Sequence, residues 1–166
     1  MSTISLGGTP VNTSGLLPAV GATAPAFEVV GADLSTIEST SLIGERVVLN
    51  IFPSVDTPTC AASVRRFNEA ASQLDNTSVL CVSADLPFAA SRFCGAEGLD
   101  NVMTGSTFRH SSFAGDFGVE LVDGPFAGLL ARAVVVLDTD GTVLHTELVA
   151  EIADEPDYDA AMSALG

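Results

Sequence analysis

The sequence predicts an α/β fold, in which helices cover a mixed central β-sheet. One observation is that two apolar, strand-like runs flank a segment of helical periodicity between residues 47 and 82. A second is that two further strand-like runs and a helical pattern close the chain. With 166 residues, 47% of them apolar, the chain is long and hydrophobic enough for one domain over residues 1–166.

The first forty residues predict an N-terminal β-hairpin and one further strand. Two β-prone runs, Thr3–Leu6 and Thr9–Asn12, flank Gly7-Gly8, a pair that suits a tight hairpin turn. Residues 27–30 form a possible strand, and the polar residues that follow, up to residue 40, favour turns.

The clearest unit is a strand, helix and strand between residues 47 and 82. Residues 47–52 are apolar and rich in β-branched side chains, as expected of a strand buried on both faces. Residues 61–74 then place their apolar side chains on one helical face, and Asp75-Asn76 ends the helix. Residues 79–82 form the next strand, so a right-handed crossover is expected.

The remaining elements follow from local signals. Pro87 and Gly95 bracket a second helix over residues 87–94. A loop-rich stretch then holds, in chain order, a short strand around Val102 and a helical piece over residues 112–117. The end of the chain reads as strands 133–137 and 142–148, joined by a hairpin turn, and a final helix over 158–165.

Charge and hydropathy exclude several functions. Six Arg residues and no Lys face 21 acidic residues, for a net charge of −15. This balance repels nucleic acid and anionic membranes. No apolar run approaches the length of a membrane span, and the N-terminus lacks the pattern of a secretion signal, so we expect a cytoplasmic protein.

Cys60 is the strongest candidate for chemistry. It follows the strand 47–52 and a short polar loop, and it precedes the helical pattern that starts at Ala61. Its sulfur is therefore expected at a helix N-terminus, where free backbone N–H groups and the helix dipole favour a thiolate. Because the thiolate is the reactive form, the sequence predicts a reactive cysteine.

The other two cysteines differ in character. Cys81 lies within a buried strand and is expected to be an inert core residue. Cys94 lies near the end of the second helix, 34 positions after Cys60 (94 minus 60), which is too far for a CxxC pair. The cysteine spacings match no metal site. A disulfide between Cys60 and Cys94 would need Cα atoms within about 7 Å, so one helix would have to unwind, as for a transient bond.

Arg132 is the best candidate for a cationic partner of Cys60, because it stands at the start of the strand 133–137. His110 and His145 are more typical of surface or satisfied histidines, which argues against a Cys–His hydrolase. Arg65 and Arg66 are expected on a solvated helix face.

Three loop residues complete the candidate site. Thr57 could donate its hydroxyl to a substrate oxygen, or it could cap the helix. Pro53 stiffens the loop, and Asp56 is expected to point away from the sulfur. We also place Phe126 in the apolar pocket around this motif.

These residues resemble a known family. The pattern Pro53-x-x-x-Thr57-x-x-Cys60 resembles the active-site motif of peroxiredoxins, and the longer string 54–68 is similar to the bacterial thiol peroxidase branch, the atypical two-cysteine type. The string 81–94 is similar to the same branch, and the likeness covers nearly the whole chain. One departure is Thr59, where the family pattern has an apolar residue.

The resemblance implies a thioredoxin-like fold and an antioxidant enzyme that reduces hydrogen peroxide and organic hydroperoxides. It implies that Cys60 is the peroxidatic cysteine and that Cys94 resolves its sulfenic acid as an intrachain disulfide. Thr57 and Arg132 would hold the peroxide, and Pro53 would shield the sulfur from bulk water. It further implies thioredoxin as the reductant, a homodimer, and no metal or other cofactor.

Other functions are compatible with some of these residues. A redox sensor would use the same two cysteines but would pass the oxidation to a partner protein. A dithiol–disulfide oxidoreductase is disfavoured by the lack of a CxxC pair. A purely structural acidic protein would leave Cys60 inert.

Overall fold

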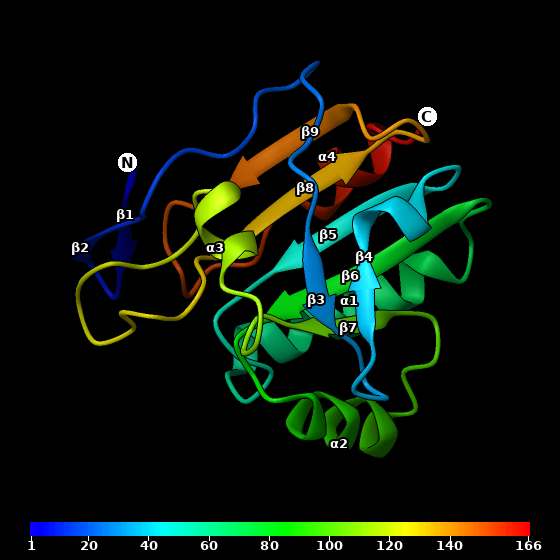
Figure 1. The fold of residues 1–166 in the computed structure, drawn as a ribbon. Helices are drawn as coiled ribbons and strands as arrows, with labels where there is room; N and C mark the ends of the chain where they lie inside the picture. Colours follow the sequence, from blue (N-terminus) through cyan, green and yellow to red (C-terminus); the bar gives the residue numbers. More distant parts are fainter.

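The computed structural model describes residues 1–166 and has a seven-stranded mixed sheet, a separate two-stranded hairpin and helices on both sheet faces (Figure 1). The hairpin consists of β1 (Thr3–Leu6) and β2 (Thr9–Asn12). The strands of the sheet, in chain order, are β3 (Glu28–Val30), β4 (Thr36–Glu38), β5 (Arg46–Ile51), β6 (Thr77–Ser83), β7 (Met103–Ser106), β8 (Ala133–Leu137) and β9 (Val143–Leu148). The helices are η1 (Ser39–Leu42, a 3₁₀ helix), α1 (Pro58–Ala71), α2 (Pro87–Glu97), α3 (Ser112–Asp116) and α4 (Tyr158–Ser163).

The sheet has the strand order β4-β3-β7-β6-β5-β8-β9. The central strands β5, β6 and β7 are parallel, and α1 and α2 make the crossovers between them. All other neighbours in the sheet are antiparallel. Because β5 and β6 are parallel, the loops that follow them leave the same edge of the sheet, and this edge carries the site described below.

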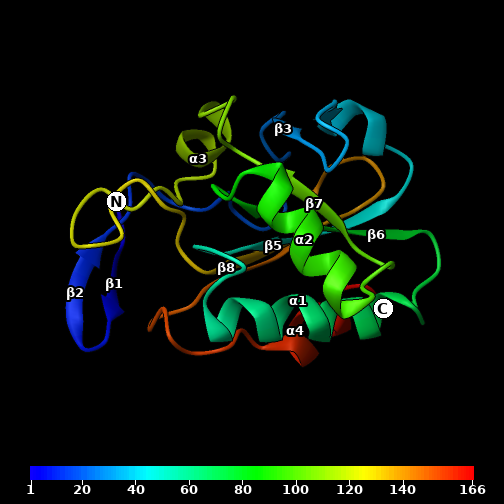
Figure 2. The ribbon, with the colours of Figure 1, turned by 90° about the horizontal axis from the view of Figure 1, so that it is seen from below.

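Strand β5 divides the core into two apolar layers. Val47, Leu49 and Ile51 pack on the face that also holds the Phe113 and Phe117 rings of the α3 region. Val48 packs on the opposite face, with α1 and α4. Figure 2 shows α1 and α4 together along one face of the sheet, with α3 on the other side. The prediction that this strand is buried on both faces is confirmed.

The predicted fold class, the hairpin and the central strand–helix–strand unit are confirmed, and three of the details that differ have a local physical reason. Strand β4 lies in a region predicted as turns. The sequence does not predict it, because this short edge strand has only one apolar residue, Ile37, between two polar ones. Helix α1 begins earlier than predicted, at Pro58, since proline is well suited to the first helical position. Helix α2 continues past Gly95 to Glu97, and Gly98, which adopts φ +67°, caps its end.

The hairpin is attached to the chain that follows β9. Ser5 forms a parallel bridge with Glu151, and Ile4 and Val11 pack in an apolar cluster with Ile152. The Glu151 carboxylate accepts hydrogen bonds from four groups, which are the N–H groups of Ala153, Gly8 and Gly7 and the hydroxyl of Ser5. These donors, led by the Ala153 N–H, lower the pKa of Glu151 to about 2.

None of the helices combines the length and the hydrophobicity that crossing a lipid bilayer requires.

The attachment of the hairpin should persist at moderately acidic pH. A carboxyl group whose pKa is lower in the folded state stabilises the fold above its unfolded pKa, and this contribution is lost as the pH falls towards the folded value. For Glu151 that window runs from the ordinary 4.5 down to about 2. We expect the amide NMR signals of Gly7 and Gly8 to stay unchanged between neutral pH and about pH 4. A titration of these signals centred near the ordinary glutamate value would contradict the prediction, and Glu151→Gln should abolish their low-pH titration.

Candidate active site

Cys60 is the third residue of α1 and is completely buried. The chain leaves β5, passes through the loop 52–57 and enters the helix at Thr57, whose backbone is extended. Phe52, Val55 and Val64 belong to the same apolar cluster as the Cys60 side chain. The prediction that the sulfur lies at a helix N-terminus is therefore confirmed.

Arg132 lies beside this sulfur. Its Nη2 donates a hydrogen bond to the Cys60 Sγ at 3.2 Å, and its Nε donates to the Ile152 carbonyl at 2.7 Å. The guanidinium is only 1% exposed, and it forms no ion pair with a carboxylate. A buried cation is costly unless acceptors or an anion compensate it, and here its N–H groups reach the Ile152 carbonyl and the Cys60 sulfur. The arrangement therefore places a buried cation in direct contact with the sulfur.

Two further donors near the sulfur are unused. The Arg132 Nη1 is buried and has no hydrogen-bond partner. The backbone N–H of Cys60 also lacks an acceptor, as expected for the first turn of a helix. An incoming molecule with a polar oxygen would thus meet donors that no protein group already occupies.

Asp85 orders the loop that precedes Cys60. Its carboxylate accepts hydrogen bonds from the Ser54 hydroxyl at 2.7 Å, from the Val55 N–H at 2.8 Å and from the Ser83 hydroxyl at 2.8 Å. Sequence reasoning missed this residue. The signal was available, because Asp85 lies two residues after β6, and the loops after two adjacent parallel strands meet at one sheet edge.

Thr57 and Pro53 lie in the same loop. Thr57 occupies the N-cap position, but its side chain does not cap the helix. The hydroxyl instead donates to the Ser54 carbonyl at 3.0 Å, so its proton is already engaged and its oxygen is left as an acceptor. Pro53 is buried and directly follows the buried Phe52.

The other two cysteines have higher pKa values than a free thiol. Burial raises the pKa of Cys81 to about 12, although the Asn50 amide contacts its sulfur at 3.7 Å. Cys81 is thus a core thiol, as predicted. Burial and, to a smaller extent, the charge of Asp100 raise the pKa of Cys94. Cys94 lies within α2, half-buried against the apolar cluster that contains Cys60. All three cysteines are free.

The remaining polar candidates form contacts with other residues or lie in other elements. His110 approaches Glu28 at 3.5 Å, and His145 lies in β9. Arg65 pairs with Glu97, whereas Arg66 stacks over Tyr158.

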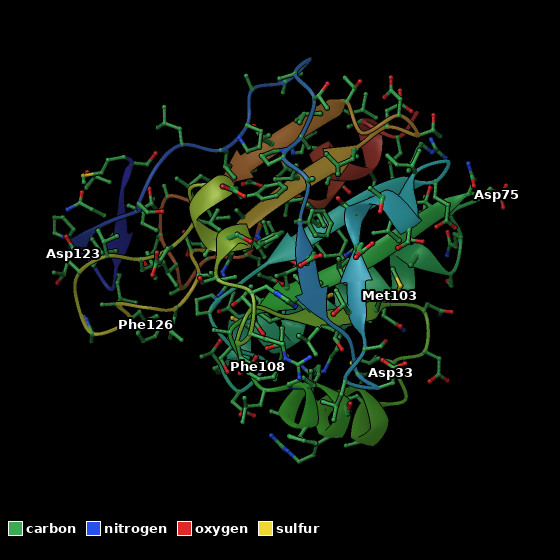
Figure 3. All side chains as sticks on the ribbon, viewed as in Figure 1. Asp33, Asp75, Met103, Phe108, Asp123 and Phe126 are labelled. Carbon is green, nitrogen blue, oxygen red and sulfur yellow. The ribbon has the colours of Figure 1, made fainter.

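The expectation for Asp56 is confirmed, and the expectation for Phe126 is wrong. Asp56 is exposed and paired with Arg92, so it points outward as predicted. Placing Phe126 near Cys60 was wrong, since its ring packs against the apolar cluster under the hairpin. Figure 3 shows it on the loop beside the hairpin, near Asp123. This loop position cannot be inferred from hydrophobicity alone.

A thioredoxin-like sheet with a helix-terminal thiol beside a buried guanidinium defines a thiol-based redox protein. The family model described as Redoxin matches residues 19–162, and the chain therefore belongs to the redoxin family. It is 60% identical over 166 residues to proteins called thiol peroxidase from Mycobacterium tuberculosis and Mycobacterium bovis, an alignment that covers 100% of this chain and 99% of theirs. It is thus a peroxiredoxin, an enzyme of thiol-dependent peroxide reduction.

Solved structures agree with this assignment. A peroxiredoxin-like protein from Aquifex aeolicus superposes with a TM-score of 0.93 at 36% identity, over 99% of this chain and 96% of that one. A thiol peroxidase from Chromobacterium violaceum has the same fold, with a TM-score of 0.91 at 22% identity and the same coverage of both chains.

Removing the guanidinium should make the Cys60 sulfur less reactive. Charge-assisted hydrogen bonds contribute about 1.5 to 3 kcal/mol, so we expect Arg132→Met to slow alkylation of Cys60 at neutral pH by about 10- to 100-fold. The rate can be followed by mass spectrometry with iodoacetamide. Arg109→Met is the matched control, because Arg109 is exposed and stacks only on Phe108. Equal alkylation rates in wild type and Arg132→Met would contradict the electrostatic role.

Proposed function

We propose that Cys60 is the peroxidatic cysteine of this enzyme and that Arg132 stabilises both its thiolate and the transition state. The observation that carries the proposal is the 3.2 Å contact between the buried Cys60 Sγ and the buried Arg132 Nη2, without a carboxylate to neutralise the cation. The substrate class is hydrogen peroxide and organic hydroperoxides. The apolar cluster around Cys60 supports the organic ones, because it can contact an alkyl group.

The first step is a displacement in line with the O–O bond. The thiolate gives an electron pair to one peroxide oxygen, the S–O bond forms, and the O–O bond breaks. Negative charge develops on the leaving oxygen, which takes a proton from the solvent, where the thiol proton was released, and departs as water or an alcohol. The free Arg132 Nη1 and the free Cys60 N–H are the donors that would stabilise this charge, and such stabilisation is stronger in the transition state than in the bound substrate.

Thr57 and Pro53 complete the proposed pocket. Since the Thr57 hydroxyl donates to the Ser54 carbonyl, its oxygen would accept the O–H of the peroxide rather than donate to it. A peroxide held by this hydrogen bond presents the opposite side of its O–O group to the Cys60 sulfur. Pro53, buried beside Phe52, would keep bulk water away from the thiolate.

Cys94 is the proposed resolving cysteine. Its sulfur attacks the Cys60 sulfenic acid, the S–S bond forms, and the hydroxyl group leaves with the thiol proton as water. The raised pKa of Cys94 keeps it a thiol in the folded enzyme, which leaves the first step to Cys60. Both cysteines lie in helices, so α2 must unwind locally before the disulfide can form.

Helix α2 has features that make unwinding easy. It buries only Pro87 and Ala90, and it contains Gly95 next to Cys94. Glycine inside a helix is less favourable than alanine by about 1 kcal/mol. Two exposed ion pairs, Arg92–Asp56 and Arg65–Glu97, connect this helix to the loop before Cys60 and to α1, and water screens such pairs.

The intrachain disulfide needs a dithiol reductant, and thioredoxin is the proposed one, by thiol–disulfide exchange. A cycle that depends on reduced thiols suits the cytoplasm, where thiols are kept reduced. We further propose a homodimer, as the resemblance to the thiol peroxidase branch implies.

The cysteine roles can be separated by substitution. We expect Cys60→Ser to abolish hydroperoxide consumption coupled to thioredoxin and NADPH. Cys94→Ser should keep one oxidation of Cys60 per chain but lose turnover, because no disulfide reaches thioredoxin. Cys81→Ala is the control and should keep turnover, since that sulfur lies in the core. Normal turnover in Cys60→Ser would overturn the assignment, and oxidation of wild-type Cys60 without turnover would favour a redox sensor.

Stabilising α2 should slow the resolving step. The Gly95→Ala side chain meets no atom within 4 Å, and it should stabilise the helix by about 1 kcal/mol. We therefore expect disulfide formation to slow by about fivefold, with the first oxidation unchanged. Stopped-flow kinetics can measure both steps. Gly115→Ala, in α3 and equally open, is the matched control. An unchanged resolving rate would mean that α2 does not unwind during this step.

A further inference from the structure

The chain that follows β9 passes beside the hairpin before it reaches α4 (Figure 1). We call residues 150–153 the clamp segment. On the site side, two consecutive carbonyls of this segment accept hydrogen bonds. The Ile152 carbonyl accepts from the Arg132 Nε at 2.7 Å, and the Ala153 carbonyl accepts from the Thr59 hydroxyl at 2.8 Å. The segment thus holds the guanidinium and the residue directly before Cys60.

On the opposite side, the hairpin fixes the conformation of the clamp segment. The Ser5 N–H donates to the Ala150 carbonyl, and the Ile152 N–H donates to the Ser5 carbonyl, both at 2.8 Å. Between these bonds, the Glu151 carboxylate accepts from Gly7 and Gly8, whose positive φ angles turn their N–H groups towards it. The same carboxylate binds the Ala153 N–H at 3.0 Å and so shapes the segment itself.

The Thr59 hydroxyl forms a second link between the first turn of α1 and the clamp segment. An apolar residue at this position could not donate a hydrogen bond, whereas the threonine hydroxyl reaches across to the Ala153 carbonyl. The long Arg132 side chain has many rotamers, and the Ile152 carbonyl selects one that directs Nη2 at the sulfur. Small displacements of such groups have large effects on rate.

We propose that Glu151 and Thr59 are positioning residues for peroxide reduction, and that they act by fixing the clamp segment between the hairpin and the Cys60–Arg132 pair. This inference rests on the proposed roles of Cys60 and Arg132. Neither Glu151 nor Thr59 contacts the sulfur, so their effect on the reaction passes through the orientation of Arg132 and of the first turn of α1.

The test compares two reactions of Cys60 in the full-length protein. One is its single oxidation by hydrogen peroxide, and the other is its alkylation by iodoacetamide. Both need the thiolate, but only the first needs donors for a departing oxygen. The variants are Thr59→Val, which removes the hydroxyl at constant shape, Thr59→Ser, which restores it, and Glu151→Gln. Thr36→Val and Glu120→Gln are matched controls, because Thr36 is exposed in β4 and neither residue takes part in the hydrogen bonds of the clamp segment.

We expect Thr59→Val and Glu151→Gln each to lower the peroxide rate by about tenfold and to lower the alkylation rate much less. Thr59→Ser should restore the ratio of the two rates, and the controls should match wild type. A variant that lowers the thermal unfolding midpoint while the ratio stays at the wild-type value would overturn the inference, since its role would be structural only. If Glu151→Gln does not fold, the Thr59 pair decides the result.

Failure of this inference is distinguishable from failure of the proposed function. If only the inference fails, Thr59→Val and Glu151→Gln behave like wild type, while Arg132→Met remains impaired and Cys60→Ser remains inactive. If the proposed function fails, Cys60→Ser keeps turnover or Arg132→Met reacts normally with peroxide, whatever the clamp variants do.

Discussion

The structure depends on a buried guanidinium that has no carboxylate partner. Burial of an uncompensated cation is costly, so the fold tolerates Arg132 only because a main-chain carbonyl and an ionisable sulfur face it. In the proposed mechanism, the same contact that makes the cation tolerable also stabilises the thiolate. Stability and reactivity are therefore not separable at this site, and the strands and loops around it serve to hold two groups in contact.

The two proposed redox cysteines, Cys60 and Cys94, lie in parts of the fold with different local stability. Cys60 follows a fully buried strand, and Asp85 and the clamp segment restrain its loop and its helix start from two sides. Cys94 lies in a helix with few buried residues and a glycine beside it. A rigid first site suits a reaction that needs oriented donors, whereas a weak helix suits a reaction in which a sulfur has to travel.

The sequence predicted most of the elements, because the signals for them are local. The Gly7-Gly8 pair, the β-branched run of β5 and the proline at the start of α2 all act within a few residues. Strand β4 was missed since three residues with one apolar side chain carry almost no periodic signal. Cys60 and Arg132 could be proposed as partners from their flanking strands.

The contacts that orient these partners could not be predicted in the same way. Thr59 and Ala153 are far apart in the chain, and the acceptor is a backbone carbonyl, which has no signature in the sequence. Glu151 is one of 21 acidic residues, and no residue near it in the chain indicates that it binds the hairpin. The direction of the Thr57 hydrogen bond could not be predicted either. Its hydroxyl donates to the Ser54 carbonyl, and the loop geometry determines this contact.

The acceptor that orients Arg132 belongs to the peptide backbone of Ile152, and this affects which substitutions the position tolerates during evolution. Single-codon changes replace side chains but leave a peptide carbonyl in place. Substitutions at position 152 are therefore limited only by the need to fill the apolar cluster under the hairpin. The Arg132 guanidinium keeps its hydrogen-bond acceptor after any substitution that preserves the path of the chain.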